Sequence, residues 1–205
     1  MQAWILKNST NRLIKFLLIV LGMIPMTRLL VLGNLNQLSA NPIEFITRST
    51  GTWALVFLCI TLTISPLRTI LKWNGIVRFR RTLGLIAFFY ASLHFFIWIY
   101  LDHQLNWEEI LKDFYKRTYI LFGLIAFLIM SLLAMTSNQW SIQMLKQKWS
   151  SLHKLIYPLS ILALLHYWIH KAAKNDFGTV SIYATVVLSL LLFRSYKFLK
   201  RRYQS

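Results

Sequence analysis

The sequence predicts an all-α membrane protein, a polytopic bundle of six transmembrane helices. Of its 205 residues, 57% are hydrophobic and only 14% are charged, whereas about a quarter of the residues in a soluble domain are charged. Apolar runs close to the ~20 residues needed to cross a bilayer recur along the chain. The segments between these runs are short and rich in basic residues, which is the pattern that orients helices in a membrane.

The six spans are expected, in chain order, at approximately Leu13–Leu32, Thr52–Leu67, Thr82–Leu101, Tyr119–Thr136, Leu152–His170 and Phe177–Phe193. The first span is interrupted by Pro25 and Arg28, and neighbouring helices can accommodate a proline within a membrane helix. The second is short and is expected to end near Pro66. No stretch remains for a separate soluble domain, so residues 1–205 are expected to form one transmembrane domain.

The charge distribution predicts the orientation. With the N-terminus placed inside, 16 of the 23 basic residues fall on the inner side, and all six acidic residues fall on the outer side. This bias predicts that both termini are cytoplasmic and that the inner face attracts anionic membrane lipid. The net charge of +17 does not indicate nucleic-acid binding, because no recognition motif accompanies it.

The largest outer segment runs from Asp102 to Lys116. Its residues Leu105, Ile110, Leu111 and Phe114 are spaced so that they could form one apolar helical face, which suggests a short helix lying on the membrane surface. Such a helix is the natural place for a partner to bind. A simple connector is the alternative.

Two histidines within the predicted spans are candidate ligands of a haem iron. Ionisable residues inside a membrane are costly and are functional candidates by default. With Arg81 and Leu152 as the inner helix ends, a rise of ~1.5 Å per residue places His94 ~20 Å and His166 ~21 Å into the membrane. Neutral imidazole is a common haem ligand. The matched depth favours one bis-histidine haem b between spans three and five, and packed polar groups are the alternative.

His153 lies near the predicted inner edge, ~20 Å from His166, and span three offers Arg80 and Arg81 at that level instead of a histidine. Three interpretations remain open. His153 binds the iron of a second haem with a different opposite ligand, or contacts a flavin or a haem propionate together with these arginines, or caps a helix start.

Several sequence motifs of known enzyme and nucleotide-binding classes are absent. The chain contains no H-E-x-x-H, no G-x-x-x-x-G-K-[ST] and no G-x-G-x-x-G motif. Electrons must therefore come from another protein or from a membrane quinol, since no nicotinamide-binding domain is recognisable. No carboxylate lies within a predicted span, which argues against a proton-driven transporter.

A set of stretches between about Asn41 and Lys171 carries a specific resemblance: N-P-I-E at 41–44, T-G-T-W-A-L at 50–55, T-I-S-P-L-R at 63–68, R-F-R-R-T-L-G-L-I-A-F-F-Y-A-S-L-H-F at 78–95, K-R-T-Y-I at 116–120, L-A-M-T-S at 133–137, L-H-K-L-I-Y at 152–157 and L-L-H-Y at 164–167. Together they resemble the MsrQ family, haem-binding membrane subunits of the periplasmic protein-methionine-sulfoxide reductase system in the ferric reductase-like transmembrane superfamily.

The resemblance implies six helices in a bacterial inner membrane, with haem b and FMN as cofactors. It implies that electrons pass from a quinol of the respiratory chain, or from a cytoplasmic flavin reductase, to a periplasmic molybdenum-containing subunit. That partner, rather than this chain, would reduce methionine sulfoxide in oxidised proteins. The haem histidines of the family match His94, His153 and His166. No FMN motif is legible, so no FMN residues are assigned.

Two other functions remain as alternatives. The first, within the same superfamily, is a transmembrane subunit of a metal-ion (ferric) reductase, which the missing flavin domain makes less favoured. The second is a haem-free transporter or assembly factor in which the histidines are packed polar groups. The optical spectrum of the purified protein distinguishes the last of these from the haem proteins.

Overall fold

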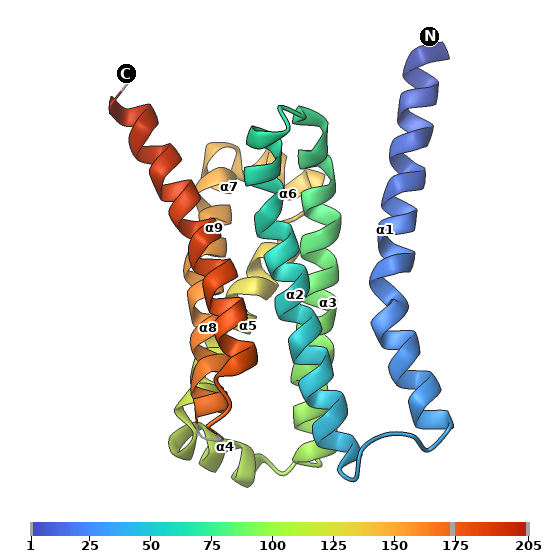
Figure 1. Cartoon of the computed structure of the whole chain (residues 1–205), viewed down its shortest axis with the longest axis vertical. Helices are drawn as coiled ribbons and strands as arrows, with labels where there is room; N and C mark the ends of the chain where they lie inside the picture. The colour runs from blue at the N-terminus through green and yellow to red at the C-terminus, as the bar shows by residue number, and fades with distance from the viewer. Residues whose placement is uncertain (1, 173–174, 204–205) are drawn as a thin grey trace.

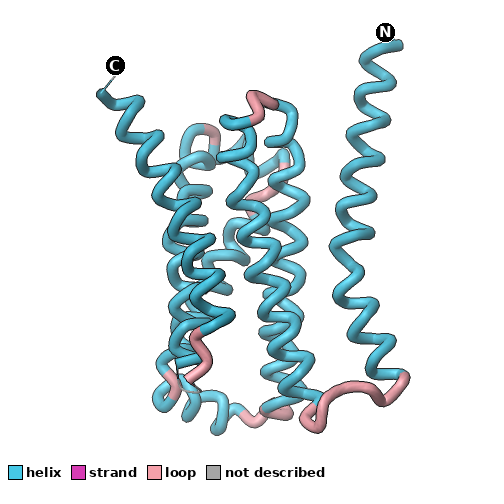
Figure 2. The backbone as a smooth tube through the Cα atoms, viewed as in Figure 1, coloured by secondary structure: helices cyan, strands magenta, loops and turns pink. Residues whose placement is uncertain are grey.

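The computed structural model describes residues 2–172 and 175–203, with side chains except those of residues 2–9, 198 and 201–203. Over this part of the chain the secondary structure is entirely helical, with short loops (Figure 2). The helices are α1 (Gln2–Asn34), α2 (Pro42–Ile70), η1 (Asn74–Phe79), α3 (Arg80–Ile97), η2 (Trp98–Asp102), α4 (Trp107–Lys116), α5 (Thr118–Met135), α6 (Gln139–Leu145), α7 (Gln147–Leu152), η3 (His153–Leu155), α8 (Ile156–Ala172) and α9 (Gly178–Tyr203).

Six helical segments in the described residues are long and apolar enough to cross a membrane: Thr10–Asn34, Pro42–Ile70, Asn74–Asp102, Thr118–Met135, Gln147–Ala172 and Gly178–Lys197. The predicted fold class and the six spans are confirmed. The prediction that the second span is short was wrong, because α2 has 29 residues. Its start is set by Asn41, whose side chain accepts a hydrogen bond from the Glu44 amide, and by Pro42 in the first turn.

The bundle is built from two helix pairs, with α2 packed along α3 and α5 packed along α8. Helix α9 packs against both α8 and α2. Helix α1 stands to one side and makes its main contacts with α3 (Figure 1). The start of α1 and the end of α9 lie at the same end of the bundle, and α4 lies across the opposite end (Figure 1). We call these the terminal end and the α4 end.

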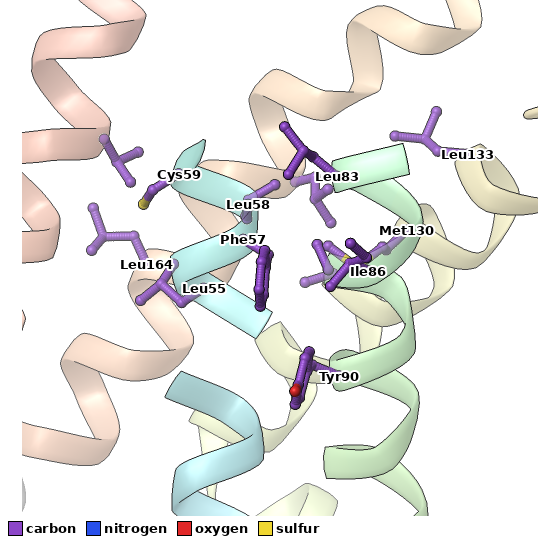
Figure 3. Close-up of a cluster of buried hydrophobic side chains, with 14 of the residues drawn as sticks. Leu55, Phe57, Leu58, Cys59, Leu83, Ile86, Tyr90, Met130, Leu133 and Leu164 are labelled. Atoms are coloured by element: carbon purple, nitrogen blue, oxygen red, sulfur yellow. The ribbon is translucent and has the colours of Figure 1, made fainter. Parts of the chain in front are cut away.

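The core lies where the two pairs meet. Buried side chains from α2, α3, α5, α8 and α9, including Leu58, Ile86, Met130 and Leu164, form one apolar cluster (Figure 3). Within it the rings of Phe57 and Tyr90 stack at a centroid distance of 5.6 Å and an angle of 9°. Because lipid chains are as apolar as this cluster, close packing rather than exclusion of water stabilises the contact between the helices.

Pro25 lies inside α1 without ending it, and Tyr90 of α3 supports the helix next to it. The Tyr90 hydroxyl donates to the Gly22 carbonyl at 2.7 Å and accepts from the Met26 amide at 3.1 Å, which bridges a backbone pair one turn apart. Gly22 allows this approach, since a Cβ there would lie 2.9 Å from Ile86 Cδ1. A neighbouring helix therefore satisfies backbone groups close to the proline, as expected inside a membrane.

A second proline is accommodated in the same way. Pro66 in α2 has no amide hydrogen, so the Leu62 carbonyl lacks its helical donor. Arg194 of α9 supplies a replacement, because its Nη2 donates to the Leu62 carbonyl at 2.8 Å and to Ser65 Oγ at 3.1 Å. This contact holds α9 against α2 near the terminal end of the bundle.

We expect Arg194→Met to lower the free energy of unfolding by about 1–2 kcal/mol more in the natural chain than in a Pro66→Ala background. An alanine at 66 donates its own amide to Leu62, so the arginine is then no longer needed there. Unfolding in mixed detergent micelles measures the loss of unfolding free energy caused by Arg194→Met in each background. Equal costs in the two backgrounds would contradict the assignment, and Arg68→Met, which removes an exposed bond to Asn74, is the control.

Helix α4 confirms that the segment 102–116 contains a helix. Asn106 caps it by accepting from the Glu109 amide. Of the four residues predicted to form its apolar face, Leu105 lies before the helix, Ile110 is buried and Leu111 is 58% exposed. Phe114, one turn from Ile110, instead packs edge-on against Trp98 at a ring distance of 5.9 Å. One side of α4 thus covers the bundle and the other side is exposed.

Candidate functional site

A cavity of about 740 Å³ lies between α2, α3, α5 and α8 and extends to the α4 end. This volume is within the range of ~300–1,000 Å³ typical of cofactor and ligand sites. The part of the cavity nearest the middle of the bundle is lined by apolar side chains, among them Leu55, Leu58, Ala126, Met130 and Leu159. Polar and charged residues line it only towards the α4 end.

His94 of α3 and His166 of α8 both line this cavity. Their ring centroids are 6.0 Å apart, with the ring planes at 80°. The depths calculated from the helical rise therefore agree with the structure, which brings the two rings together at one level. That they bind iron stays a prediction.

Each ring is held by a backbone carbonyl of the partner helix in its pair. His94 Nδ1 donates to the Thr47 carbonyl of α2 at 2.8 Å, and His166 Nδ1 donates to the Tyr119 carbonyl of α5 at 2.7 Å. Because a carbonyl only accepts, these bonds place the proton of each neutral ring on Nδ1. Both Nε2 atoms are left with a lone pair, which is the arrangement of a metal-binding histidine oriented by an outer partner.

Two glycines make room for these rings. A Cβ on Gly51 would lie 2.9 Å from His94 Nδ1, and a Cβ on Gly123 would lie 2.6 Å from His166 Nδ1. Any larger residue would push the imidazole away from its carbonyl. Sequence reasoning missed this role, although each glycine follows, by four residues, the residue whose carbonyl holds the ring.

The two half-sites repeat each other. Thr47, Gly51 and His94 each precede their counterparts Tyr119, Gly123 and His166 by the same 72 residues. The pair α2–α3 is therefore matched in geometry by the pair α5–α8, and the two histidines face each other across the interface between the pairs. No internal repeat was expected, because few side chains are shared between the pairs and the match lies in the geometry.

The site fits a haem held by two histidines. Two metal–nitrogen bonds of about 2 Å, together with the two rings, fit the 6.0 Å between the ring centres. Both donors are neutral nitrogens in a largely apolar cavity, which suits a b-type haem iron. In the described part of the chain no group of three or more histidine, cysteine or carboxylate side chains could hold a metal by itself.

Charged residues gather where the cavity reaches the α4 end. Arg48 pairs with Glu44 at 3.3 Å and Arg117 pairs with Asp113 at 3.2 Å. Lys171, only 5% exposed, donates a hydrogen bond to Asp176. This bond lowers the pKa of the Asp176 carboxyl below its usual range. Arg48, Arg117 and Lys171 all line the cavity.

His153 does not join the other two histidines and does not line the cavity. Its Nδ1 donates to the Trp149 carbonyl at 3.1 Å, and its ring stacks on Trp149 at a centroid distance of 4.0 Å. Of the two arginines expected at its level, Arg80 is partly buried and interacts electrostatically with His153, whereas Arg81 is exposed. Arg81 stands 72 residues before His153, so this level has no second histidine in the matched position.

Comparison with known proteins identifies the family of the chain. The family described as ferric reductase like transmembrane component matches residues 50–164. The chain is 46% identical to the protein-methionine-sulfoxide reductase heme-binding subunit MsrQ of Ralstonia nicotianae, over 91% of this chain and 86% of that protein. It is 46% identical to the MsrQ of Bordetella pertussis over 92% of each chain, and 48% identical to that of Herminiimonas arsenicoxydans over 89% and 84%. The chain belongs to the MsrQ family, within the ferric reductase-like transmembrane proteins.

Proposed function

We propose that this chain holds haem b between His94 and His166 and carries electrons through the membrane to a methionine sulfoxide reductase. The observation that supports this most directly is the pair of rings 6.0 Å apart across a cofactor-sized cavity. The relatives are named as the heme-binding subunits of a protein-methionine-sulfoxide reductase. A haem with two histidine ligands supplies one-electron transfer and leaves no open position on the iron for a substrate.

The protein supplies position and environment for such a haem. The carbonyls of Thr47 and Tyr119 orient the two imidazoles and raise their basicity. The apolar wall keeps water away from the iron, and burial of this kind is one of the factors that set a reduction potential. Each histidine is held by its own helix pair, so the protein would keep both ligands of a haem in place during one-electron transfer.

The proposed direction is from the membrane or the cytoplasm towards the periplasm. The bias in basic residues supports a periplasmic α4 end and cytoplasmic termini, and the bacterial inner membrane rests on the family resemblance. The immediate donor is a quinol or a cytoplasmic flavin reductase. The acceptor is a periplasmic molybdenum-containing subunit, which carries out the sulfoxide reduction in oxidised proteins.

His153 and Arg80, at the terminal end, are proposed as residues of the donor side. Either a second haem bound through His153 or an FMN contact with Arg80 would belong here, and FMN rests on the family resemblance alone. Haem and flavin stoichiometry on the purified protein decides between these arrangements. If the chain binds one haem and His153→Ala still binds it, that haem belongs to His94 and His166. If the chain binds two haems and His153→Ala loses one, the second haem belongs to His153.

The electron-transfer role has its own expected result. Chemically reduced protein, mixed anaerobically with the periplasmic partner and a protein-bound methionine sulfoxide, is expected to be reoxidised with the return of its oxidised absorption spectrum. With the partner in catalytic amount and the sulfoxide omitted, most of the protein should stay reduced, because a molybdenum centre accepts at most two electrons per partner molecule. A protein that stays reduced in the complete mixture refutes the sulfoxide role.

One second function is favoured by a specific observation, the match to a ferric reductase-like family. If the chain were a ferric reductase subunit, a soluble ferric chelate would oxidise the reduced protein as fast as the partner with sulfoxide does. The proposed function expects the partner to be the faster oxidant.

A further inference from the structure

We propose that Arg48 and Lys171 bind the two propionate carboxylates of the haem, and so fix which edge of the haem faces the α4 end. This inference rests on the proposed haem site between His94 and His166. It goes beyond that site because it assigns two further binding residues and gives the cofactor a direction in the bundle.

The polarity of the cavity is uneven. A haem has one apolar edge and one edge with two carboxylates. A carboxylate in an apolar environment is very costly unless it is paired and hydrogen-bonded. The wall towards the middle of the bundle is formed by side chains such as Leu55, Met130 and Leu159, while the cations that line the cavity all lie towards the α4 end. The carboxylate edge must therefore point to the α4 end.

One of these cations is far more buried than the acid with which it pairs, and a second lies one helical turn further along its helix than its acid. In α2, which starts at the α4 end, Arg48 lies one turn deeper than its partner Glu44. In the other pair the Lys171 side chain is 7% exposed and that of Asp176 is 47% exposed. Lys171 thus lies towards the cavity and its acid towards the surface, so it can bind a second carboxylate from inside. The side chains of Arg48 and Glu44 are equally exposed, at 43% and 42%, and both residues line the cavity, so Arg48 is also available to a carboxylate there.

The two cations belong to one side of the cavity. Lys171 Nζ lies 5.9 Å from the centre of the Tyr167 ring. Arg48 comes from α2 but lines the same cavity as Lys171 and Tyr167. Lys171 follows His166 by five residues, or about 7.5 Å along the helix. The cations are thus within reach of the edge of a haem bound at that histidine.

The repeat of 72 residues shows that the charges are confined to this side. The counterpart of Arg48 in the second helix pair is Ile120, and the counterpart of Lys171 in the first is Ile99. These isoleucines are 8% and 9% exposed. On that opposite side the rings of Phe95 and Phe127 stack at a centroid distance of 4.4 Å and close the gap between α3 and α5. The two half-sites are matched around the histidines, and only the charges make one side of the cavity different.

Arg117, the third cation, is a natural control. It lines the same end of the cavity, but its side chain is 51% exposed while that of its partner Asp113 is 11% exposed. Its acid is the buried member of the pair, the reverse of the arrangement at Lys171. The other acid that lines this end, besides Glu44, is Asp102, and it lies on the side of α3.

The test compares binding of haem with binding of its dimethyl ester, in which both carboxylates are neutral. The affinity ratio of the two is measured by titrating haem-free, detergent-solubilised protein and following the spectrum of bis-histidine haem. We expect the natural chain to prefer haem. Arg48→Gln and Lys171→Met should each reduce the preference about tenfold or more, as for loss of a charge-assisted hydrogen bond. The double variant should show almost none.

Two further variants make the result specific. Asp176→Asn removes the acid that competes for Lys171 and should increase the preference for haem, whereas Arg117→Gln should leave it unchanged. A ratio of two affinities on the same protein is insensitive to the fraction that is folded. If the double variant retains the natural preference, or if Arg117→Gln abolishes it, the assignment is wrong. If the natural chain binds neither compound, the proposed haem site itself fails.

Discussion

Replacing either His94 or His166 by alanine is expected to weaken haem binding more than about 100-fold, beyond the loss of 10–100-fold caused by removing an outer partner of a metal ligand. Each ring supplies one nitrogen of the histidine pair whose centroids lie 6.0 Å apart in the cavity. With one ligand gone, half of the proposed protein ligation of the iron is lost. The sharp reduced alpha band of a b-type haem and the haem content of the purified protein report the result.

His103→Ala is the control for this pair of variants. His103 lies outside the cavity, with its Nε2 3.2 Å from Asp113, and its replacement should leave the haem content and the spectrum unchanged. A natural chain that is colourless after purification would contradict the proposal, and so would a full alpha band in both His94→Ala and His166→Ala. A band lost in only one of the two would indicate a different opposite ligand.

Gly123→Ala is expected to produce the largest effect of any substitution that leaves the histidines in place. The added methyl would lie 2.6 Å from His166 Nδ1 and 2.8 Å from Cε1, a distance at which the ring must move. Movement of the ring breaks its hydrogen bond to the Tyr119 carbonyl and misplaces Nε2. Loss of such an outer partner typically costs 10–100-fold in metal affinity, and we expect a loss of that size here.

A matched control comes from another glycine in a membrane helix of the same bundle. A Cβ on Gly84 would meet only Thr61 Cγ2, at 3.7 Å, which is ordinary contact. Gly84→Ala should therefore keep the haem affinity of the natural chain. Gly51→Ala should resemble Gly123→Ala with a somewhat smaller effect, because its closest distance to His94 is 2.9 Å. If Gly123→Ala binds haem as tightly as Gly84→Ala does, the glycine has no role in placing the ligand.

Much of the fold followed from local properties of the chain. Apolar runs of membrane length predicted six spans, and six are present in the described residues. The errors have local causes too. The segment 42–51 is polar, so hydropathy alone began the second span too late in the chain, although Asn41 and Pro42 form a standard helix start. For α4, spacing alone did not show which residues of its apolar face the bundle covers, Ile110 being buried and Leu111 exposed.

In the candidate site, too, some features could be predicted from the sequence and others could not. Depth along a helix depends only on the number of residues and the rise per residue, so the common level of His94 and His166 was predictable. The direction in which each ring points depends on how the helices pair and how closely they approach, and this set the roles of Gly51 and Gly123. The placing of His153 against Trp149, away from the cavity, was equally inaccessible from spacing.

The sequence by itself determined that this chain is a helical membrane protein of the MsrQ family, because span length, charge bias and motif are carried by short stretches. Only the tertiary structure decided which residues surround the two histidines. Arg48 and Lys171 are 123 positions apart in the chain, yet both line one cavity. Contacts of this kind arise from the packing of whole helices against each other, and helical rise and hydropathy along one segment contain no information about them.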